Sequence, residues 1–327
     1  MLITNRHNIP LALAVWAVQD NYDFIPDAIS ATALLKPLRQ LILNKRIEPT
    51  ERTPVDVSDL LASAFGKALH SATEYAWSDA TRVAEALTVL GFDKHVISNV
   101  RINPDPSTVN EYTIPIYIEK RISRVIDGVT ITGKYDLVSE GLLQDYKSTS
   151  AYSWVHGSND TNHAMQGSIY RWLDAGQEYP VIHEDYININ YLFTDWQKST
   201  AMSNPDYPQQ RVAHKAIPLM SVEDTENWIR NRIKTIQYSS NLSDSELPEC
   251  TEEELWFSKK VYKYFSDPTK VGGRSTRTFN DIISAQQYMV SKSGKGIITE
   301  SSSEPKRCGY CSAANICTQR LKYFPTL

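Results

Sequence analysis

Three runs with the alternating pattern of β-strands follow one another between residues 114 and 149, and this arrangement constrains the fold more than any other feature of the sequence. The runs cover about residues 114–122, 129–138 and 142–149, and Asp127-Gly128 and Glu140-Gly141 supply turns between them. Short turns of this kind join neighbouring antiparallel strands. The sequence therefore predicts a three-stranded meander.

Helical patterns flank the meander on both sides. One long pattern runs from about residue 57 to 90, a second from about 162 to 175, and a further strand is expected at residues 186–193. The order of helix, three strands, helix and strand is typical of an α/β sandwich built on a mixed sheet. We expect helices to flank this central sheet.

Charged residues collect on the last two strands of the predicted meander. The two-residue period of a strand places Leu143, Asp145 and Lys147 on one face, and Asp136 precedes Asp145 by nine positions. Paired carboxylates repel each other unless a cation lies between them, and their oxygens suit Mg²⁺ or Mn²⁺. Such a metal activates water and stabilises charge on a phosphodiester, while an ammonium orients the attacking water. Alternatively, Asp145 and Lys147 are ordinary exposed residues of a strand.

The two helices carry further polar pairs at a spacing of four residues. Gly66 and His70 share a face of the first helix, and Gln166 and Tyr170 share a face of the second. Each pair alone is more typical of packed or solvated side chains. Their order along the chain is more informative, because the charged strands lie between them.

This order resembles the PD-(D/E)xK nuclease superfamily, and within it the RecB-type exonucleases, which include AddB-type and CRISPR-associated nucleases. The similarity covers roughly residues 60 to 175 and extends to the C-terminal cysteines. It implies a restriction-endonuclease-like core. It also implies that His70, Asp136 and Asp145 are metal ligands, with the carbonyl of Tyr146 as a fourth, and that Glu119 is a further acidic residue near the metal.

The resemblance assigns roles to the remaining motif residues as well. Lys147 is implied to position or activate water, and Gln166 and Tyr170 to act near the DNA backbone and the active site. The expected protein is therefore a metal-dependent deoxyribonuclease acting on DNA ends or single strands, in recombination, repair or the processing of viral or foreign DNA. The alternative is a catalytically weak module of the same fold that binds DNA or recruits a partner.

All four cysteines lie in the last quarter of the chain, at Cys250, Cys308, Cys311 and Cys317. Disulfides are not expected, because no secretory segment is recognised and a chain of this size buries its own core. The spacing resembles the [4Fe–4S] site of AddB-type nucleases, although their fourth ligand usually precedes the nuclease core. A structural Zn²⁺ site is the alternative, and a packed thiol beside three unliganded cysteines is the third interpretation.

The net charge of −4 is unusual for a protein that binds DNA, so a local basic region is needed. One lies between residues 257 and 277, where cations alternate with Tyr262, Tyr264 and Phe265. Cations neutralise phosphates and aromatic rings stack on unpaired bases, although a charged run can also be a solvated face. The candidate DNA-binding residues are Lys259, Lys260, Lys263, Arg274 and Arg277.

The predicted organisation has three parts: a helical segment at residues 1–55, the nuclease core at 56–240, and a cysteine-bearing region at 241–327. The most apolar stretch, residues 11–18, is too short to span a bilayer, so we expect a cytoplasmic protein without membrane contact. The sequence has no phosphate-binding loop of the helicase type, and any unwinding of DNA would need a helicase or recombination partner.

Overall fold

The computed structural model describes residues 3–19, 25–157, 159–257, 260–301 and 304–324. The chain forms two compact units, and each draws on segments that are distant in sequence. The larger unit contains residues 3–36 and 55–240, and the smaller contains residues 37–54 and 241–327. Residues 1–55 therefore contribute to both units, and the three-part division of the sequence stays a prediction.

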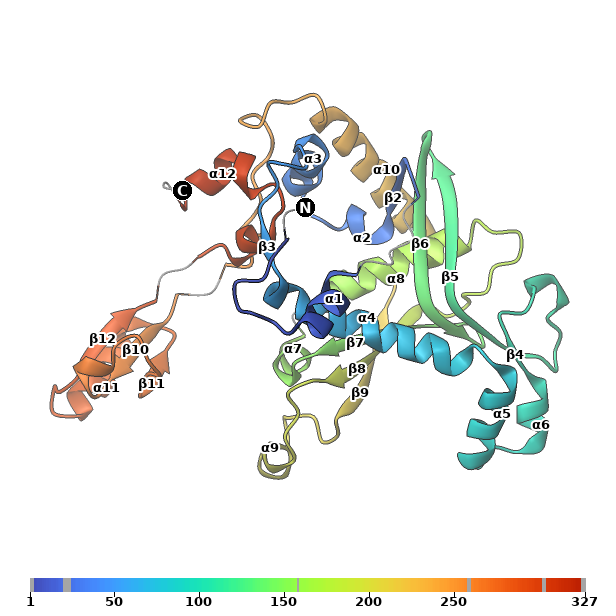
Figure 1. Ribbon diagram of the computed structural model, residues 1–327, viewed down its shortest axis with the longest axis horizontal. Helices are drawn as coiled ribbons and strands as arrows, with labels where there is room; N and C mark the ends of the chain where they lie inside the picture. The colour runs from blue at the N-terminus through green and yellow to red at the C-terminus, as the bar shows by residue number, and fades with distance from the viewer. Residues whose placement is uncertain (1–2, 20–24, 158, 258–259, 302–303, 325–327) are drawn as a thin grey trace. The chain divides into compact units, whose positions relative to one another are not determined.

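A mixed sheet is the centre of the larger unit (Figure 1). Its strands run in the order β4-β5-β6-β7-β8-β9, and β2 adds to β6. Their bounds are Ala28–Ser30 for β2, Val100–Ile102 for β4, Ile114–Ile126 for β5, Val129–Ser139 for β6, Leu142–Thr149 for β7, Tyr186–Phe193 for β8 and Val212–Pro218 for β9. With helices against this sheet, the chain has the α/β fold of the predicted restriction-endonuclease-like class.

The predicted meander is confirmed. Strands β5 and β6 pair antiparallel from Ile116 with Ser139 to Ile126 with Val129, and β6 pairs antiparallel with β7. Both turns end on a glycine in the left-handed region, with φ of +74° at Gly128 and +85° at Gly141. Glycine adopts this conformation without the steric cost that a side chain brings, so the two dipeptides close the hairpins.

Strand β7 lies between β6 and β8 and pairs with them in opposite directions. It is antiparallel to β6 at Leu142–Gln144 but pairs in parallel with β8 from Leu143 to Thr149. A parallel pair needs a crossover connection, which here contains α7 (Ala151–His156) and α8 (Asp160–Asp174). The helix predicted at residues 162–175 and the strand predicted at 186–193 are both confirmed.

The helical pattern predicted at residues 57–90 forms two helices rather than one. Helix α4 spans Val57–Trp77 and α5 spans Ala80–Val89. The break arises because the Asp79 carboxylate accepts hydrogen bonds from the backbone N–H groups of Thr81 and Arg82, which caps a new helix. The single long helix was therefore a wrong interpretation of a continuous hydrophobic pattern.

Two glycines allow α8 to approach the sheet closely. A methyl group at Gly133 on β6 would lie 2.8 Å from the ring of Tyr170, and one at Gly167 on α8 would lie 2.7 Å from Leu219. Both separations are shorter than side chains tolerate. The glycines therefore fix the height of the helix above the sheet, and with it the positions of the polar residues that the helix carries.

The larger unit contains seven further α-helices and strands among its described residues. They are β1 (Ile3–Thr4), α1 (Leu11–Val18), α2 (Ala31–Leu34), β3 (Val55–Asp56), α6 (Lys94–Asn99), α9 (Lys198–Ser203) and α10 (Val222–Ser239). The Ser30 hydroxyl caps α2 by accepting a hydrogen bond from the Ala33 N–H. Helix α10 packs against α8.

The smaller unit joins α3 (Leu38–Arg46) to the C-terminal region of the chain. The Thr53 N–H donates to the Ser312 carbonyl at 3.1 Å, and the Ser312 hydroxyl donates to Asn44 Oδ1 at 2.8 Å. Within this unit, β10 (Tyr262–Phe265), β11 (Arg277–Phe279) and β12 (Ile297–Glu300) form a three-stranded antiparallel sheet. Helix α11 (Ile282–Ser291) packs on it, and Figure 1 shows the four elements grouped together. Helix α12 covers Thr318–Leu321.

None of the described helices combines the length and the hydropathy that crossing a lipid bilayer requires.

Candidate functional site

The polar site lies where β6 and β7 separate. The ladder between these strands ends at Leu137 and Gln144, so Asp136 and Asp145 stand one position beyond its last pair. There the Tyr146 N–H donates a hydrogen bond of 2.8 Å to Asp136 Oδ2 instead of continuing a backbone ladder. Because β7 continues beside β8 after its ladder with β6 has ended, the two carboxylates stand at the point where β6 and β7 diverge.

His70, Glu119 and Asp136 form a compact group, in which one ligand atom from each residue lies within 4.8 Å of the others. His70 Nδ1 is 3.2 Å from Asp136 Oδ1 and 3.5 Å from Glu119 Oε1. The residues come from α4, β5 and β6 respectively. An imidazole and two carboxylates are suitable ligands for a divalent cation.

Glu119 has an unusual backbone conformation for a residue inside a strand. Its φ is +50°, and the pairs Ile118–Leu137 and Lys120–Tyr135 flank it without a ladder pair at Glu119 itself. A side chain in the left-handed region costs roughly 1–3 kcal/mol, which the surrounding structure must offset. Such strain is concentrated at functional sites, and here it occurs at the residue that completes the compact group.

A second set of contacts surrounds Asp145, which is 2% exposed. Lys147 Nζ lies 2.6 Å from Asp145 Oδ2, and Gln166 Nε2 donates to Asp145 Oδ1 at 3.3 Å. Gln166 Nε2 also lies 2.9 Å from the Tyr170 hydroxyl oxygen. Asp145 Oδ2 is buried, and its contact with Lys147 is an ion pair without the geometry of a hydrogen bond. This oxygen therefore keeps lone pairs that a metal could use.

The pKa shifts reflect the crowding of charge in this site. Hydrogen bonds to Asp136 and then Glu119 raise the pKa of His70 to about 10. Burial raises the pKa of Asp145, and the Lys147 ammonium opposes this shift. Burial works to lower the pKa of Lys147, but the carboxylates of Asp145 and Asp136 outweigh it, and the pKa is raised. Without a metal, the proton on His70 and the Lys147 ammonium supply the positive charge.

The arrangement differs in one respect from the ligand set expected from the sequence. His70 and Asp136 do converge, and Glu119 completes their group, whereas Asp145 lies outside it and contacts Lys147 and Gln166. The electrostatic influence of Asp136 and His70 on the Asp145 pKa shows that the two groups are neighbours. The metal-binding and catalytic roles of these residues stay predictions.

Lys134 is a site residue that the sequence reasoning missed. Its Nζ lies 2.7 Å from Glu119 Oε2, and burial of Glu119, which works to raise its pKa, is outweighed by His70 and Lys134. The available signal was its place two residues before Asp136.

The side chains of the site fit a divalent cation. His70 converges with the carboxylate oxygens of Glu119 and Asp136, and a buried oxygen of Asp145 accepts no hydrogen bond of good geometry.

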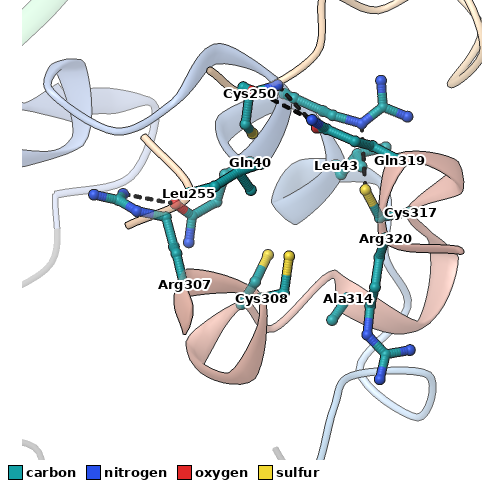
Figure 2. A pocket seen from close by; sticks show the side chains of 12 residues that line it. Gln40, Leu43, Cys250, Leu255, Arg307, Cys308, Ala314, Cys317, Gln319 and Arg320 are labelled. Carbon is teal, nitrogen blue, oxygen red and sulfur yellow. Dashed lines mark hydrogen bonds between the residues drawn. The ribbon is translucent and has the colours of Figure 1, made fainter. Parts of the chain in front are cut away.

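The four cysteines line one pocket of the smaller unit. Figure 2 shows the sulfur atoms of Cys250, Cys308 and Cys317 at separate places around it. In the described part of the chain, no three cysteine sulfurs lie within 4.8 Å of one another. A tetrahedral zinc site, with bonds of about 2.3 Å, would hold its sulfurs roughly 3.8 Å apart. Among the described residues, the cysteine sulfurs therefore do not form a preformed zinc site of that size.

The wall of this pocket also contains buried arginine atoms without hydrogen-bond partners. These are Arg307 Nε and Arg320 Nη1, counted among the residues that the structure describes. Burial raises the pKa of Cys250 to about 12, which favours the neutral thiol when no metal is bound. A thiolate-ligated anionic centre would give the cysteines their charged form and the arginines an anion to face.

The basic segment forms part of the small sheet and its turns. Lys260 pairs with Glu300, Lys263 is half-buried, and Arg277 stacks on Phe279 and Tyr288. Arg274 is exposed, and Lys259 lies outside the described residues. Tyr264 and Phe265 are 2% and 3% exposed, so the prediction that they stack on bases was wrong for the folded state. Their rings pack inside the unit because a small sheet needs them for its core.

Comparison with known proteins supports the similarity seen in the sequence. A search among curated proteins found no match. A solved structure described as "Crystal structure of SSO0001" is 15% identical and covers 68% of this chain and 84% of that chain, with a TM-score of 0.38. The PD-(D/E)XK nuclease superfamily matches residues 26–318, which is most of the sequence and includes every motif residue described above. The chain therefore belongs to the PD-(D/E)XK nuclease superfamily.

Proposed function

We propose that the protein is a divalent-metal-dependent deoxyribonuclease that acts on DNA ends or single strands. The observation that carries this proposal is the group of His70, Glu119 and Asp136 beside the Asp145–Lys147 pair, in a chain of the nuclease superfamily. An inactive binding module would not need a buried carboxylate, an ammonium and a strained Glu119 kept together. The intact set therefore favours catalysis over the alternative of a binding module.

Each residue has a task that follows from its contacts. His70, Asp136 and Asp145 would hold Mg²⁺ or Mn²⁺, with Glu119 as a further ligand and the Tyr146 carbonyl as a candidate. The bound metal would activate water and neutralise charge on the phosphate. Lys147 would orient the attacking water, and its pairing with Asp145 keeps it protonated for that task. Gln166 donates hydrogen bonds to Asp145 and to the Tyr170 hydroxyl. It would thereby orient the Asp145 carboxylate, and it would lie near the DNA backbone.

DNA cleavage with three substrate forms tests this proposal. We expect the protein, supplied with Mg²⁺ or Mn²⁺, to degrade linear and single-stranded DNA and to leave covalently closed circular duplex intact. Nicking or linearisation of the circular duplex would contradict the requirement for ends. Binding to all three forms with no cleavage under either metal would support the binding module instead, or the need for a helicase or recombination partner.

Metal binding is expected to release a proton. Because its pKa is raised to about 10, His70 is protonated in the metal-free protein at pH 7.5, and a metal needs the neutral imidazole. Mn²⁺ affinity should rise about tenfold per pH unit between pH 7 and 9 and level off above the His70 pKa. Calorimetry in buffers of different ionisation enthalpy measures the proton count directly. Binding of Mn²⁺ with no proton release would exclude His70 as the ligand.

For the second site, we propose that Cys250, Cys308, Cys311 and Cys317 hold a [4Fe–4S] cluster. The four thiols that line one pocket, the absence of three sulfurs within 4.8 Å of one another among the described residues, and the buried arginine atoms support it over zinc.

We further propose that the basic segment contacts DNA phosphates through Lys259, Lys260, Lys263, Arg274 and Arg277. Arg274 is the best placed of these, because its side chain is exposed.

A further inference from the structure

Three arginines surround the cysteine pocket, and Arg39 is the most buried of them at 2% exposure. Its Nε donates to Cys317 Sγ at 3.2 Å, its Nη1 donates to the Leu247 carbonyl at 2.9 Å, and its Nη2 donates to the Thr318 hydroxyl at 2.7 Å. Nη2 also pairs with Asp244. The guanidinium is thus fixed on every side and cannot turn away from the sulfur.

Arg307 and Arg320 approach the pocket from the other segments that build it. Arg307 lies over the Trp256 ring at 4.1 Å and Arg320 near the Phe324 ring at 5.4 Å. In the described ranges, no carboxylate forms a salt bridge with either guanidinium, and each leaves one buried N–H without an acceptor. Arginine stays protonated in such surroundings, so the protein holds two cations without a direct carboxylate partner beside four thiols.

The electrostatic contacts connect these cations to different cysteines. The Arg39 charge acts to lower the pKa of Cys250, and the Arg320 charge acts to lower that of Cys308, in both cases against burial. Cys250 and Cys311 in turn act on Arg307, whose pKa burial lowers. Glu254 is an acid whose charge reaches both Cys250 and Arg307. Positive charge therefore reaches the pocket from several directions, with Asp244 and Glu254 offsetting part of it.

We propose that Arg39, Arg307 and Arg320 raise the reduction potential of the cluster held by these cysteines, so that the centre accepts and returns one electron. This inference rests on the proposed cluster. Four thiolates on a doubly positive iron–sulfur core carry a net charge of minus two, and addition of one electron makes it minus three with no bond broken and no proton moved. Nearby cations and a hydrogen bond to a ligand sulfur stabilise the more negative state. A one-electron donor, such as a reduced flavin or iron–sulfur protein, would supply the electron.

A purely structural centre needs no such surroundings. Burial among apolar side chains stabilises the less charged state and makes reduction harder. The pocket instead combines low solvent access with guanidinium groups, which is the combination that permits a buried site to hold an additional negative charge. Arg39 is a positioning residue as well, because its fork joins α3 to Cys317 and to the chain near Cys250.

A redox titration of the intact protein tests the inference. The protein is purified without oxygen, its iron, acid-labile sulfide and zinc are measured, and its visible and electron paramagnetic resonance spectra are followed during titration with dithionite and mediators. Each of Arg39→Gln, Arg307→Gln and Arg320→Gln should lower the midpoint potential of the cluster. For a one-electron reduction, a tenfold fall in the equilibrium constant corresponds to a fall of about 59 mV in this potential. Lys322→Gln is the control, because this exposed cation pairs with Glu249 outside the pocket and should leave the potential unchanged.

The outcomes separate this inference from the proposal on which it rests. A wild-type protein that contains zinc and no iron overturns both. A wild-type protein with a full cluster whose potential is the same in all three arginine variants overturns the inference alone. Should Arg39→Gln fail to fold because it loses its four anchors, Arg307→Gln and Arg320→Gln still decide the result, since neither arginine carries a comparable set of hydrogen bonds.

Discussion

Replacing Asp136 with asparagine is expected to lower DNA cleavage by at least about a thousandfold, on the scale found when one member of a catalytic group is removed. Asp136 pairs with His70 and accepts a hydrogen bond from the Tyr146 N–H. Its negative charge would therefore bind the metal and also keep the neighbouring residues in position. The asparagine side chain has the same size as aspartate, but it offers one uncharged oxygen in place of two oxygens that share a negative charge. We also expect Mn²⁺ to raise the melting temperature of the wild type and to have little effect on the variant.

Lys147→Met separates metal binding from catalysis. The variant loses the ammonium that would orient water, and removal of its charge raises the pKa of Asp145 further, because burial then acts unopposed by this neighbour. Cleavage should fall by at least about a hundredfold, as expected when one electrostatic group at the reacting centre is lost. Mn²⁺ should still stabilise the variant above pH 7.

Asp185→Asn is the matched control for both changes. Asp185 is an exposed acid in the same unit, directly before β8, and its substitution removes one negative charge without touching the site. We expect wild-type cleavage and a wild-type response to Mn²⁺. If Asp136→Asn cleaved DNA as fast as this control, the assignment of the site would be wrong.

Local patterns explain why much of the fold was predictable. The meander depends on turns at Gly128 and Gly141 that involve only neighbouring residues, and the two-residue period of β7 determines that Leu143 and Asp145 are both buried. The left-handed conformation of Glu119 gives no such signal, because it arises from long-range contacts that hold a strained residue in place. Sequence motifs suggested Glu119 only through resemblance to a nuclease family.

Contacts between distant segments explain what was missed. Arg39 and Cys317 are 278 positions apart, and neither the helix pattern around Arg39 nor the spacing of the cysteines indicates that they meet. The split of α4 from α5 was missed for the opposite reason. There apolar residues at helical spacing lie on both sides of Ser78 and Asp79, and the single carboxylate of Asp79 begins a second helix.

Replacing Cys311 with serine is expected to remove the proposed cluster and to loosen the smaller unit. The chain around Cys311 is tied to the N-terminal segment by Thr53, whose hydroxyl donates to the Cys311 carbonyl, and by the contact of Ser312 with Asn44. Metal binding contributes directly to folding in sites of this kind, with apparent free energies on the order of 10 kcal/mol in zinc-containing examples. Loss of one ligand should therefore abolish the visible absorbance and lower the melting temperature of this unit.

Limited proteolysis locates the effect of the substitution. We expect new cleavage within residues 241–257 and 304–317 of Cys311→Ser, because both segments line the pocket, while residues 55–240 stay resistant. Tyr310→Phe is the control, since its side chain is 70% exposed and it keeps all four thiols. Equal melting and equal digestion of Cys311→Ser and Tyr310→Phe would show that the cysteines bind no structural metal. A colourless wild type that loses zinc on the same substitution would keep the metal site but identify the metal as zinc, because four thiolates can hold either centre.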